Sequence, residues 1–195
     1  MNTIRSSRPG RPGPGSLTRG VRAARSVATV FLAAVLVASC AKQEGGSSAP
    51  AGRGAIGSEA PAFSLPDLNG NSVASSSLRG KVVILDFWAT WCPPCRAEVP
   101  DLVRLQAKYR DQGLAVVGLS LDAGGAKDVQ PFVEEHDVNY TMLIGNEEIT
   151  KAYGNISMIP TKFVLDRDGK VVQRFVGQTP PEVIEQTIRP LLAAG

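Results

Sequence analysis

Two cysteines separated by two prolines are the residues of this chain best suited to chemistry. Cys92 and Cys95 stand at the end of an apolar segment, within Trp91-Cys92-Pro93-Pro94-Cys95. At the first turn of a helix, unpaired N–H groups and the positive end of the helix dipole stabilise a thiolate. The spacing therefore predicts thiol–disulfide exchange, with Cys92 as the nucleophile and Cys95, one turn further on and less exposed, as the resolving thiol.

The residues around the pair fit the same chemistry. Pro93 and Pro94 suit the cap and first turn of a helix, where a missing N–H costs little, and they stiffen the loop. Trp91 flanks the nucleophile, and we expect it to shape the surface on which a substrate docks. Packing of Trp91 in the core is the alternative.

A zinc site and a static structural disulfide are two other uses of a Cys-x-x-Cys pair. Structural zinc needs four ligands, whereas the chain has only one further cysteine, Cys40, and one histidine, His136. A static disulfide leaves unexplained the buried strand and the aromatic residues directly before the pair. We therefore expect no metal and no cofactor other than a redox-active Cys92–Cys95 disulfide.

The rest of the chain alternates between strand-like and helix-like segments. The strand-like segments are 81–88, 114–121, 140–144, 161–165 and 170–176, and the helix-like segments are the stretch from the cysteines to Gly113, 126–135, 147–153 and 181–192. Alternation of apolar and polar residues in 62–65, with a turn at Asn69-Gly70-Asn71, adds a short N-terminal hairpin. This order predicts an α/β fold, with a central mixed sheet flanked by helices.

The excess of basic over acidic residues in this chain comes from its first forty residues. The whole sequence has a formal charge of +3, but residues 1–40 contain six arginines and no acid, which leaves fifteen basic and eighteen acidic residues, a net charge of −3, for the remainder. The basic charge thus gives no support to nucleic-acid binding by the folded part.

The leader has the features of an export signal. An apolar run over 27–38 is too short to span a bilayer, which needs about 20 apolar residues, and it ends in Val37-Ala38-Ser39-Cys40, which resembles a bacterial lipobox. We interpret 1–39 as a signal peptide, 40–57 as a lipidated cysteine with a flexible tether, and 58–195 as the folded domain. A plain secretory signal or an uncleaved anchor stays open, as does the choice between the inner and the outer membrane.

Three motifs carry a resemblance to a known family. Residues 83–98, around the cysteine pair, resemble the active-site segment of thioredoxin-like proteins. The match is closer to the TlpA/ResA/CcmG group of membrane-anchored thiol–disulfide oxidoreductases, within the redoxin and AhpC/TSA-like superfamily of thioredoxin folds. Residues 57–63 resemble the opening motif shared by that group and the peroxiredoxins, and Met158-Ile159-Pro160-Thr161 resembles the loop with the cis proline of this superfamily. The resemblance implies a thioredoxin fold with an N-terminal hairpin and an insertion before the cis-proline loop.

The resemblance also implies roles for single residues. Pro160 would be cis and face the disulfide, and Ile159 would offer backbone groups to an extended substrate. Asp86 would lie beneath Cys95 and help to remove its proton, whereas Glu98 would modulate the site. An ordinary trans proline, a structural carboxylate at Asp86, and a helix salt bridge or cap at Glu98 are the respective alternatives.

The function that these features favour is reduction of protein disulfides outside the cytoplasm, as in cytochrome c maturation. It implies client proteins, an upstream membrane electron donor, a lipid anchor in a bacterial membrane, no nucleic acid and a monomeric state. An oxidant role stays open, because the sequence does not set the reduction potential. A thiol peroxidase would need a threonine three residues before the cysteine, where Ala89 stands, and a copper chaperone would need Cys-x-x-x-Cys with a histidine, whereas His136 lies far along the chain.

Overall fold

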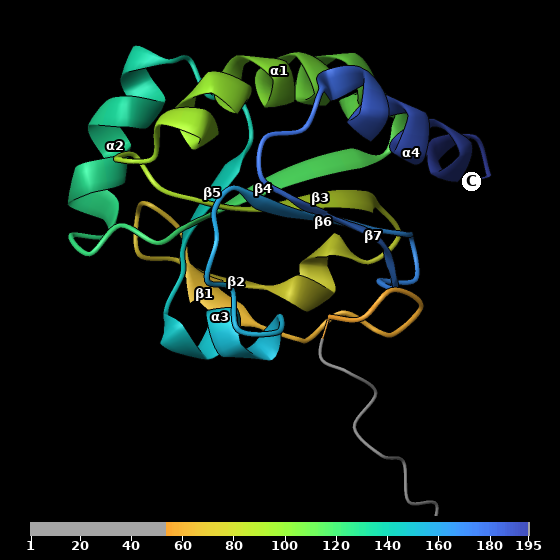
Figure 1. Ribbon diagram of the computed structural model, residues 1–195, viewed down its shortest axis with the longest axis horizontal. Helices are drawn as coiled ribbons and strands as arrows, with labels where there is room; N and C mark the ends of the chain where they lie inside the picture. The colour runs from red at the N-terminus through yellow and green to blue at the C-terminus, as the bar shows by residue number, and fades with distance from the viewer. Residues whose placement is uncertain (1–53, 195) are drawn as a thin grey trace, which may run out of the picture. The chain divides into compact units, whose positions relative to one another are not determined.

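A five-stranded mixed sheet forms the centre of the computed structural model, which describes residues 54–194. The strands follow the order β5 (Thr141–Ile144), β4 (Leu114–Ser120), β3 (Val82–Trp88), β6 (Thr161–Leu165) and β7 (Val171–Val176). β3, β4 and β5 are parallel, and β6 and β7 join them as an antiparallel pair (Figure 1). The predicted α/β class with a mixed sheet is confirmed.

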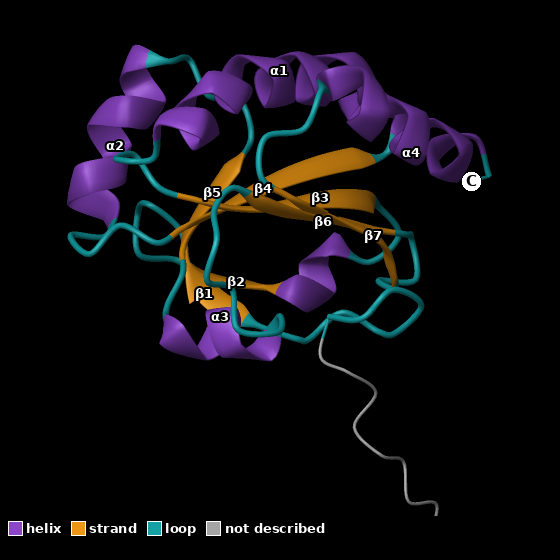
Figure 2. Ribbon diagram, in the orientation of Figure 1, coloured by secondary structure: helices purple, strands orange, loops and turns teal. Residues whose placement is uncertain are grey.

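Helices cover one face of this sheet and a thinner layer covers the other (Figure 2). α1 (Pro93–Tyr109), α2 (Ala126–Glu135) and α4 (Pro181–Ala193) lie on one face, and the apolar side chains of α1 and α4 pack there against Ile84. On the opposite face, the hairpin of β1 (Ser64–Pro66) and β2 (Ser72–Ala74), together with α3 (Glu147–Ala152), packs against Leu85 and Phe87.

Every residue of β3 is buried, because this strand lies in the middle of the sheet and both of its faces are covered. Its continuous apolar run is the pattern of a strand buried on both sides. Side chains alternate between the two faces of a strand, so Asp86 points to the same face as Ile84 and Trp88, towards α1. The single acid of β3 is thereby brought beneath the helix that begins at the cysteine pair.

The predicted additions to the basic fold are also present. β1 and β2 form an antiparallel hairpin across the Asn69-Gly70-Asn71 turn. The insertion before the cis-proline loop contains β5, which extends the sheet by an edge strand, and α3. Helix α1 continues as a short 3₁₀ turn to Gly113, whose φ of 93° is in the left-handed region that favours glycine.

The predicted signal segment and the lipidated Cys40 lie outside the described residues, so both stay predictions. Within residues 54–194 no helix is long and apolar enough to cross a membrane.

Candidate active site

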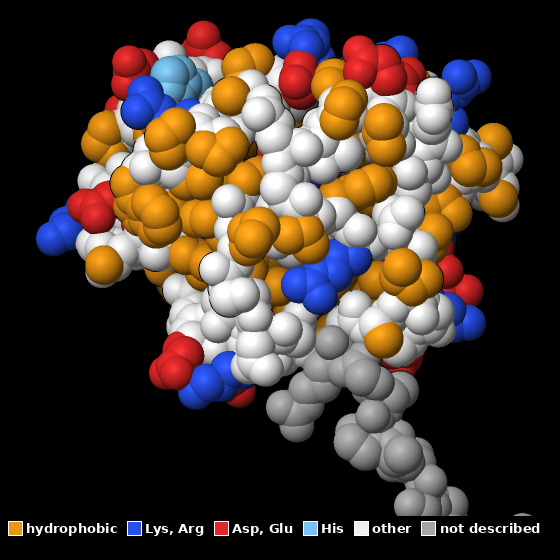
Figure 3. Space-filling model, in the orientation of Figure 1, with side chains coloured by type: hydrophobic (Ala, Val, Ile, Leu, Met, Phe, Trp, Pro, Cys, Tyr) orange, Lys and Arg blue, Asp and Glu red, His pale blue; other side chains and the backbone are white. Residues whose placement is uncertain are grey.

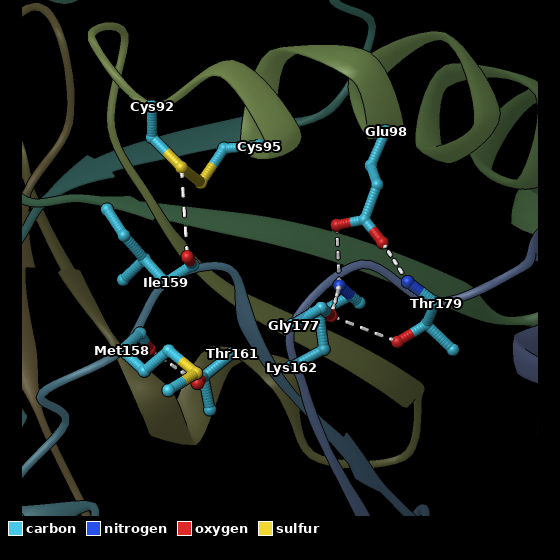
Figure 4. A network of polar contacts seen from close by, with 9 residues as sticks. All are labelled: Cys92, Cys95, Glu98, Met158, Ile159, Thr161, Lys162, Gly177 and Thr179. Atoms are coloured by element: carbon cyan, nitrogen blue, oxygen red, sulfur yellow. Dashed lines mark hydrogen bonds and ion pairs between the residues drawn. A yellow bond between two sulfur atoms is a disulfide. The ribbon is translucent and has the colours of Figure 1, made fainter.

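Cys92 and Cys95 form a disulfide at the point where β3 has ended and α1 begins (Figure 4). Cys92 is the N-cap residue of α1, and Cys95 lies in the first turn of that helix. Their exposed fractions are 4% and 1%, so Cys95 is the more deeply buried, as the sequence predicts. The strand and the helix together hold both sulfurs between the sheet and the protein surface.

Pro93 and Pro94 occupy the first two positions of α1, as their missing N–H groups allow. Because neither proline can donate a hydrogen bond, the backbone N–H of Cys95 is the first free donor of the helix. A thiolate on Cys92 would therefore depend on this donor and on the helix dipole.

The cis-proline loop lies directly opposite the disulfide. The Ile159–Pro160 peptide bond is cis, so the alternative of an ordinary trans proline is wrong. The carbonyl oxygen of Ile159 lies 3.8 Å from the Cys92 sulfur and points towards it (Figure 4). The loop itself is fixed by the Thr161 hydroxyl, which donates to the Met158 carbonyl at 2.7 Å. The fold thus brings together the cysteine pair and the cis-proline loop, the segments of two of the sequence motifs.

Two large apolar side chains beside the disulfide are open to solvent. Trp91 is 65% exposed and Met158 is 59% exposed, so packing of Trp91 in the core is wrong. Apolar side chains also gather on the visible surface over the start of α1 and next to α2 (Figure 3). Exposed apolar side chains around a reactive centre are typical of a protein-binding surface.

Asp86 is buried beneath the helix, and its Oδ1 atom has no hydrogen-bond partner among the described residues. Burial raises the pKa of Asp86 to about 7, with Lys162 lowering it and Glu98 raising it. A carboxyl group with a pKa near neutrality is suited to accept and return a proton. Its side chain points to the face of the sheet that α1 covers, and both its predicted place beneath the second cysteine and its catalytic role stay predictions.

Glu98 lies one turn after Cys95 and is buried. Its carboxylate accepts hydrogen bonds from the Lys162 ammonium group at 2.6 Å and from the Thr179 N–H at 2.5 Å (Figure 4). These contacts join α1 to β6 and to the segment before α4, so the alternative of a salt bridge within the helix is wrong. Capping of a helix, the other alternative for Glu98, is wrong, since α1 has no side-chain cap.

Sequence reasoning assigned no role to Lys162 or Asp122. A lysine within the otherwise uncharged strand-like segment 161–165 was the signal for the first. Asp122 is buried after β4 and accepts hydrogen bonds from the Thr90 N–H at 3.0 Å, the Thr90 hydroxyl at 2.5 Å and the Ser120 hydroxyl at 2.7 Å. These bonds fix the loop that leads into Cys92.

The part of the chain that the structure describes contains no group of three or more His, Cys, Asp or Glu side chains arranged to hold a metal ion. His136 packs against Phe132 at the end of α2, with ring centroids 4.1 Å apart.

A thioredoxin fold with a Cys-x-x-Cys disulfide at a helix N-terminus, opposite a cis proline, defines a thiol–disulfide oxidoreductase. The chain belongs to the AhpC/TSA family, whose model matches residues 56–174.

Individual relatives agree with this assignment. Thiol-disulfide oxidoreductase ResA from Bacillus thuringiensis subsp. konkukian is 37% identical over 137 residues, which are 70% of this chain and 78% of that protein. Thioredoxin-like protein YneN from Bacillus subtilis is 37% identical over 134 residues, 68% of this chain and 78% of its own length. A crystal structure from Chlorobium tepidum, described as a thiol:disulfide interchange protein DsbE, has a TM-score of 0.66 and 38% identity, and the match covers 71% of this chain and 98% of that one.

Proposed function

We propose that this protein reduces disulfide bonds of client proteins outside the cytoplasm, as in cytochrome c maturation, with Cys92 attacking and Cys95 resolving. The observation that carries the proposal is the arrangement of three parts: a disulfide at the N-terminus of α1, the exposed apolar side chains of Trp91 and Met158 beside it, and the buried carboxyl group of Asp86. Burial raises the pKa of this carboxyl group to about 7. The relatives that are named thiol–disulfide oxidoreductases support it.

The reaction takes place in two exchanges of sulfur bonds. The Cys92 thiolate attacks one sulfur of the client disulfide, a mixed disulfide forms, and the first client thiolate leaves. Cys95 then gives its proton to Asp86, and its thiolate attacks the Cys92 sulfur. The second client thiolate leaves and takes a proton from water. The client gains two electrons, and the protein is left with the Cys92–Cys95 disulfide.

Docking of the client uses the surface around the disulfide. Trp91 and Met158 provide apolar contacts, and the backbone of Ile159 offers hydrogen-bonding groups to an extended client segment. Return to the dithiol form needs an upstream electron donor, for which a membrane protein is the expected class. The domain acts as a monomer and binds no nucleic acid.

The reduction potential tests the direction of electron flow. Equilibration of the domain with glutathione buffers should give a value near or below those of glutaredoxins and thioredoxin, about −200 to −270 mV. A value more oxidising than that of protein disulfide isomerase, about −180 mV, would instead support the oxidant alternative. Titration of the reduced domain with Cu(I) distinguishes an oxidoreductase from a copper chaperone. Tight stoichiometric binding of Cu(I) without disulfide turnover would contradict the proposal.

Attachment to a membrane is a separate part of the proposal. The basic leader, the apolar run and the Val-Ala-Ser-Cys sequence support a lipid on Cys40. Two acyl chains anchor a protein stably, because each buried methylene adds about 0.8 kcal/mol. Cys40→Ala should block processing or release a soluble exported domain. A native N-terminus at Ala41 or later without lipid, found by mass spectrometry, would contradict the anchor but leave the redox function intact.

A further inference from the structure

Lys162 is a buried lysine in the middle of the fold to which the proposed reaction gives no role. It lies in β6, two residues after Pro160, and is 1% exposed. Its Nζ atom lies 2.6 Å from Oε2 of Glu98 and 3.4 Å from the carbonyl oxygen of Gly177 (Figure 4). A buried ammonium ion is costly unless it is paired, so the ion pair with the Glu98 carboxylate is what stabilises Lys162 in the interior.

The same lysine is the direct neighbour of Asp86 across the sheet. Asp86 and Lys162 are opposite residues of the antiparallel pair β3–β6, so their side chains share one face, with Cβ atoms about 4.5–5.5 Å apart. On its other side Asp86 is opposite Gly118 of β4, which has no side chain. Lys162 is therefore the cation that the sheet places beside Asp86.

Helix α1 contributes the other two residues of this arrangement, Cys95 and Glu98. Cys95 and Glu98 are three residues apart on α1, so they lie on one face of that helix. Cys95 and Glu98 are therefore neighbours on α1, Glu98 forms an ion pair with Lys162, and Lys162 is opposite Asp86 in the sheet. We call the three charged residues Asp86, Glu98 and Lys162 the buried charge cluster.

We propose that Lys162 is a positioning residue for the resolving step, because its ammonium group fixes the Glu98 carboxylate in place and leaves the neighbouring Asp86 carboxyl group free to take the proton of Cys95. This inference rests on the proposed function and deepens it. The step itself is a transfer of one proton from the Cys95 sulfur to an Asp86 oxygen, after which the Cys95 thiolate attacks Cys92 and the client sulfur leaves. The client disulfide is the only oxidant that it needs.

The groups that face Asp86 predict opposite effects for the two partners of the ion pair. They are Lys162 from β6, Glu98 from α1, and the buried hydroxyl of Tyr140 before β5, whose pKa is raised by burial and then by the charges of Asp86 and Glu98. Cys95 is buried on the same face of α1 as Glu98. Burial raises the pKa of Asp86, Lys162 lowers it and Glu98 raises it. Removal of the lysine charge should therefore make Asp86 harder to ionise, and removal of the Glu98 charge should make it easier.

The two exchanges can be followed separately with an aromatic disulfide whose released thiolate absorbs visible light. The reduced protein releases a first thiolate when Cys92 forms the mixed disulfide and a second when Cys95 resolves it. The rate of the second phase, measured from pH 5 to 9, gives the pH midpoint of resolution. The variants to compare are Lys162→Met, Glu98→Gln, their combination, and Lys151→Met as a matched control. Lys151 forms an exposed ion pair with Glu147 at 2.6 Å, away from the cluster.

The expected result is a displacement of the midpoint in opposite directions. Lys162→Met should raise it, and an Asp86 pKa one unit higher lowers the ionised fraction at pH 7 about fivefold, with a matching slower second phase. Glu98→Gln should lower the midpoint, and Lys151→Met should leave it unchanged. The first phase should stay close to that of the unmodified protein in all variants.

The combined variant protects the test against misfolding, because it leaves neither charge buried alone. Its midpoint should lie between those of the two single variants; if Lys162→Met does not fold, a midpoint above that of Glu98→Gln carries the same information. An unchanged midpoint in every variant, or displacement in the same direction by both single changes, would overturn the inference. Absence of the first phase in the unmodified protein would instead overturn the proposed function.

Discussion

The sulfur of Cys92 lies 3.8 Å from the carbonyl oxygen of Ile159, so the nucleophile and the cis-proline loop face each other although they are 67 residues apart. In the reduced protein the Cys92 thiol could donate a hydrogen bond to this oxygen. A client chain that approaches the sulfur must also meet the Ile159 backbone, and hydrogen bonds to an extended client segment follow from that. Attack and recognition are therefore performed at one place on the surface.

The two cysteines should differ sharply in reactivity. Alkylation of the reduced domain with iodoacetamide should show a fast phase with an inflection below the ordinary cysteine pKa of about 8.5, because Cys92 lies at the N-terminus of α1. Cys92→Ser should remove this phase, and Cys95→Ser should accumulate mixed disulfides with clients. The assignment is reversed if Cys95→Ser removes the fast phase and Cys92→Ser keeps it.

Asp86→Asn should slow resolution far more than formation of the mixed disulfide. The amide cannot accept the Cys95 proton, and loss of a positioned general base typically costs about 10²–10⁴-fold. We expect the second thiolate release to slow about 100-fold at pH 7, and its rise with pH near 7, set by the raised pKa of Asp86, to disappear. Equal slowing of both phases would mean that the carboxylate is structural.

Trp91→Ala should weaken the reduction of protein clients without affecting small disulfides. Exposed aromatic side chains are common among the residues that contribute most to protein interfaces, so we expect KM for a protein client to rise about tenfold. Stability should change by about 0.5 kcal/mol or less, since Trp91 is 65% exposed. Ile56→Ala is the matched control: it is 63% exposed but lies beside the start of β7, at the opposite end of the sheet. A similar loss in both variants would contradict a docking role for Trp91.

The fold was largely predictable because its signals are local. The continuous apolar run of 82–85 and the Gly113 stop each depend on a few neighbouring residues, and each is present in the structure as expected. The disulfide was predictable for the same reason, since its two cysteines are three residues apart.

The buried charges were harder to predict, because each depends on a distant partner. Glu98 and Lys162 are 64 residues apart, and the helical spacing of Glu98 equally suits an exposed salt bridge within α1. Asp122 binds Thr90 over 32 residues. A sequence pattern records that a charge stands in an apolar segment, but only the packing of α1 over β3 and β6 shows which charges meet.

The stability of the oxidised domain should fall as the pH rises, because of Asp86. Burial raises its pKa from 3.8 to about 7, so the folded state binds the Asp86 proton more tightly than the unfolded state does. This contribution is fully present below about pH 4 and is lost as the pH rises through 7. Each pKa unit corresponds to about 1.4 kcal/mol, which gives an upper value of about 4 kcal/mol.

Asp86→Asn isolates this contribution, because asparagine has a similar shape and no charge. In urea unfolding of the oxidised proteins, the variant should be more stable than the unmodified protein at pH 8, and the difference should shrink towards pH 4. Asp122→Asn is the matched control, since Asp122 is also buried but its carboxylate accepts hydrogen bonds from Thr90 and Ser120. This variant should lose stability at pH 8, because its amide cannot accept all of those bonds. A lower stability of Asp86→Asn at pH 8 would mean that the Asp86 carboxylate is satisfied by partners in the folded protein, and its pKa would then not be raised.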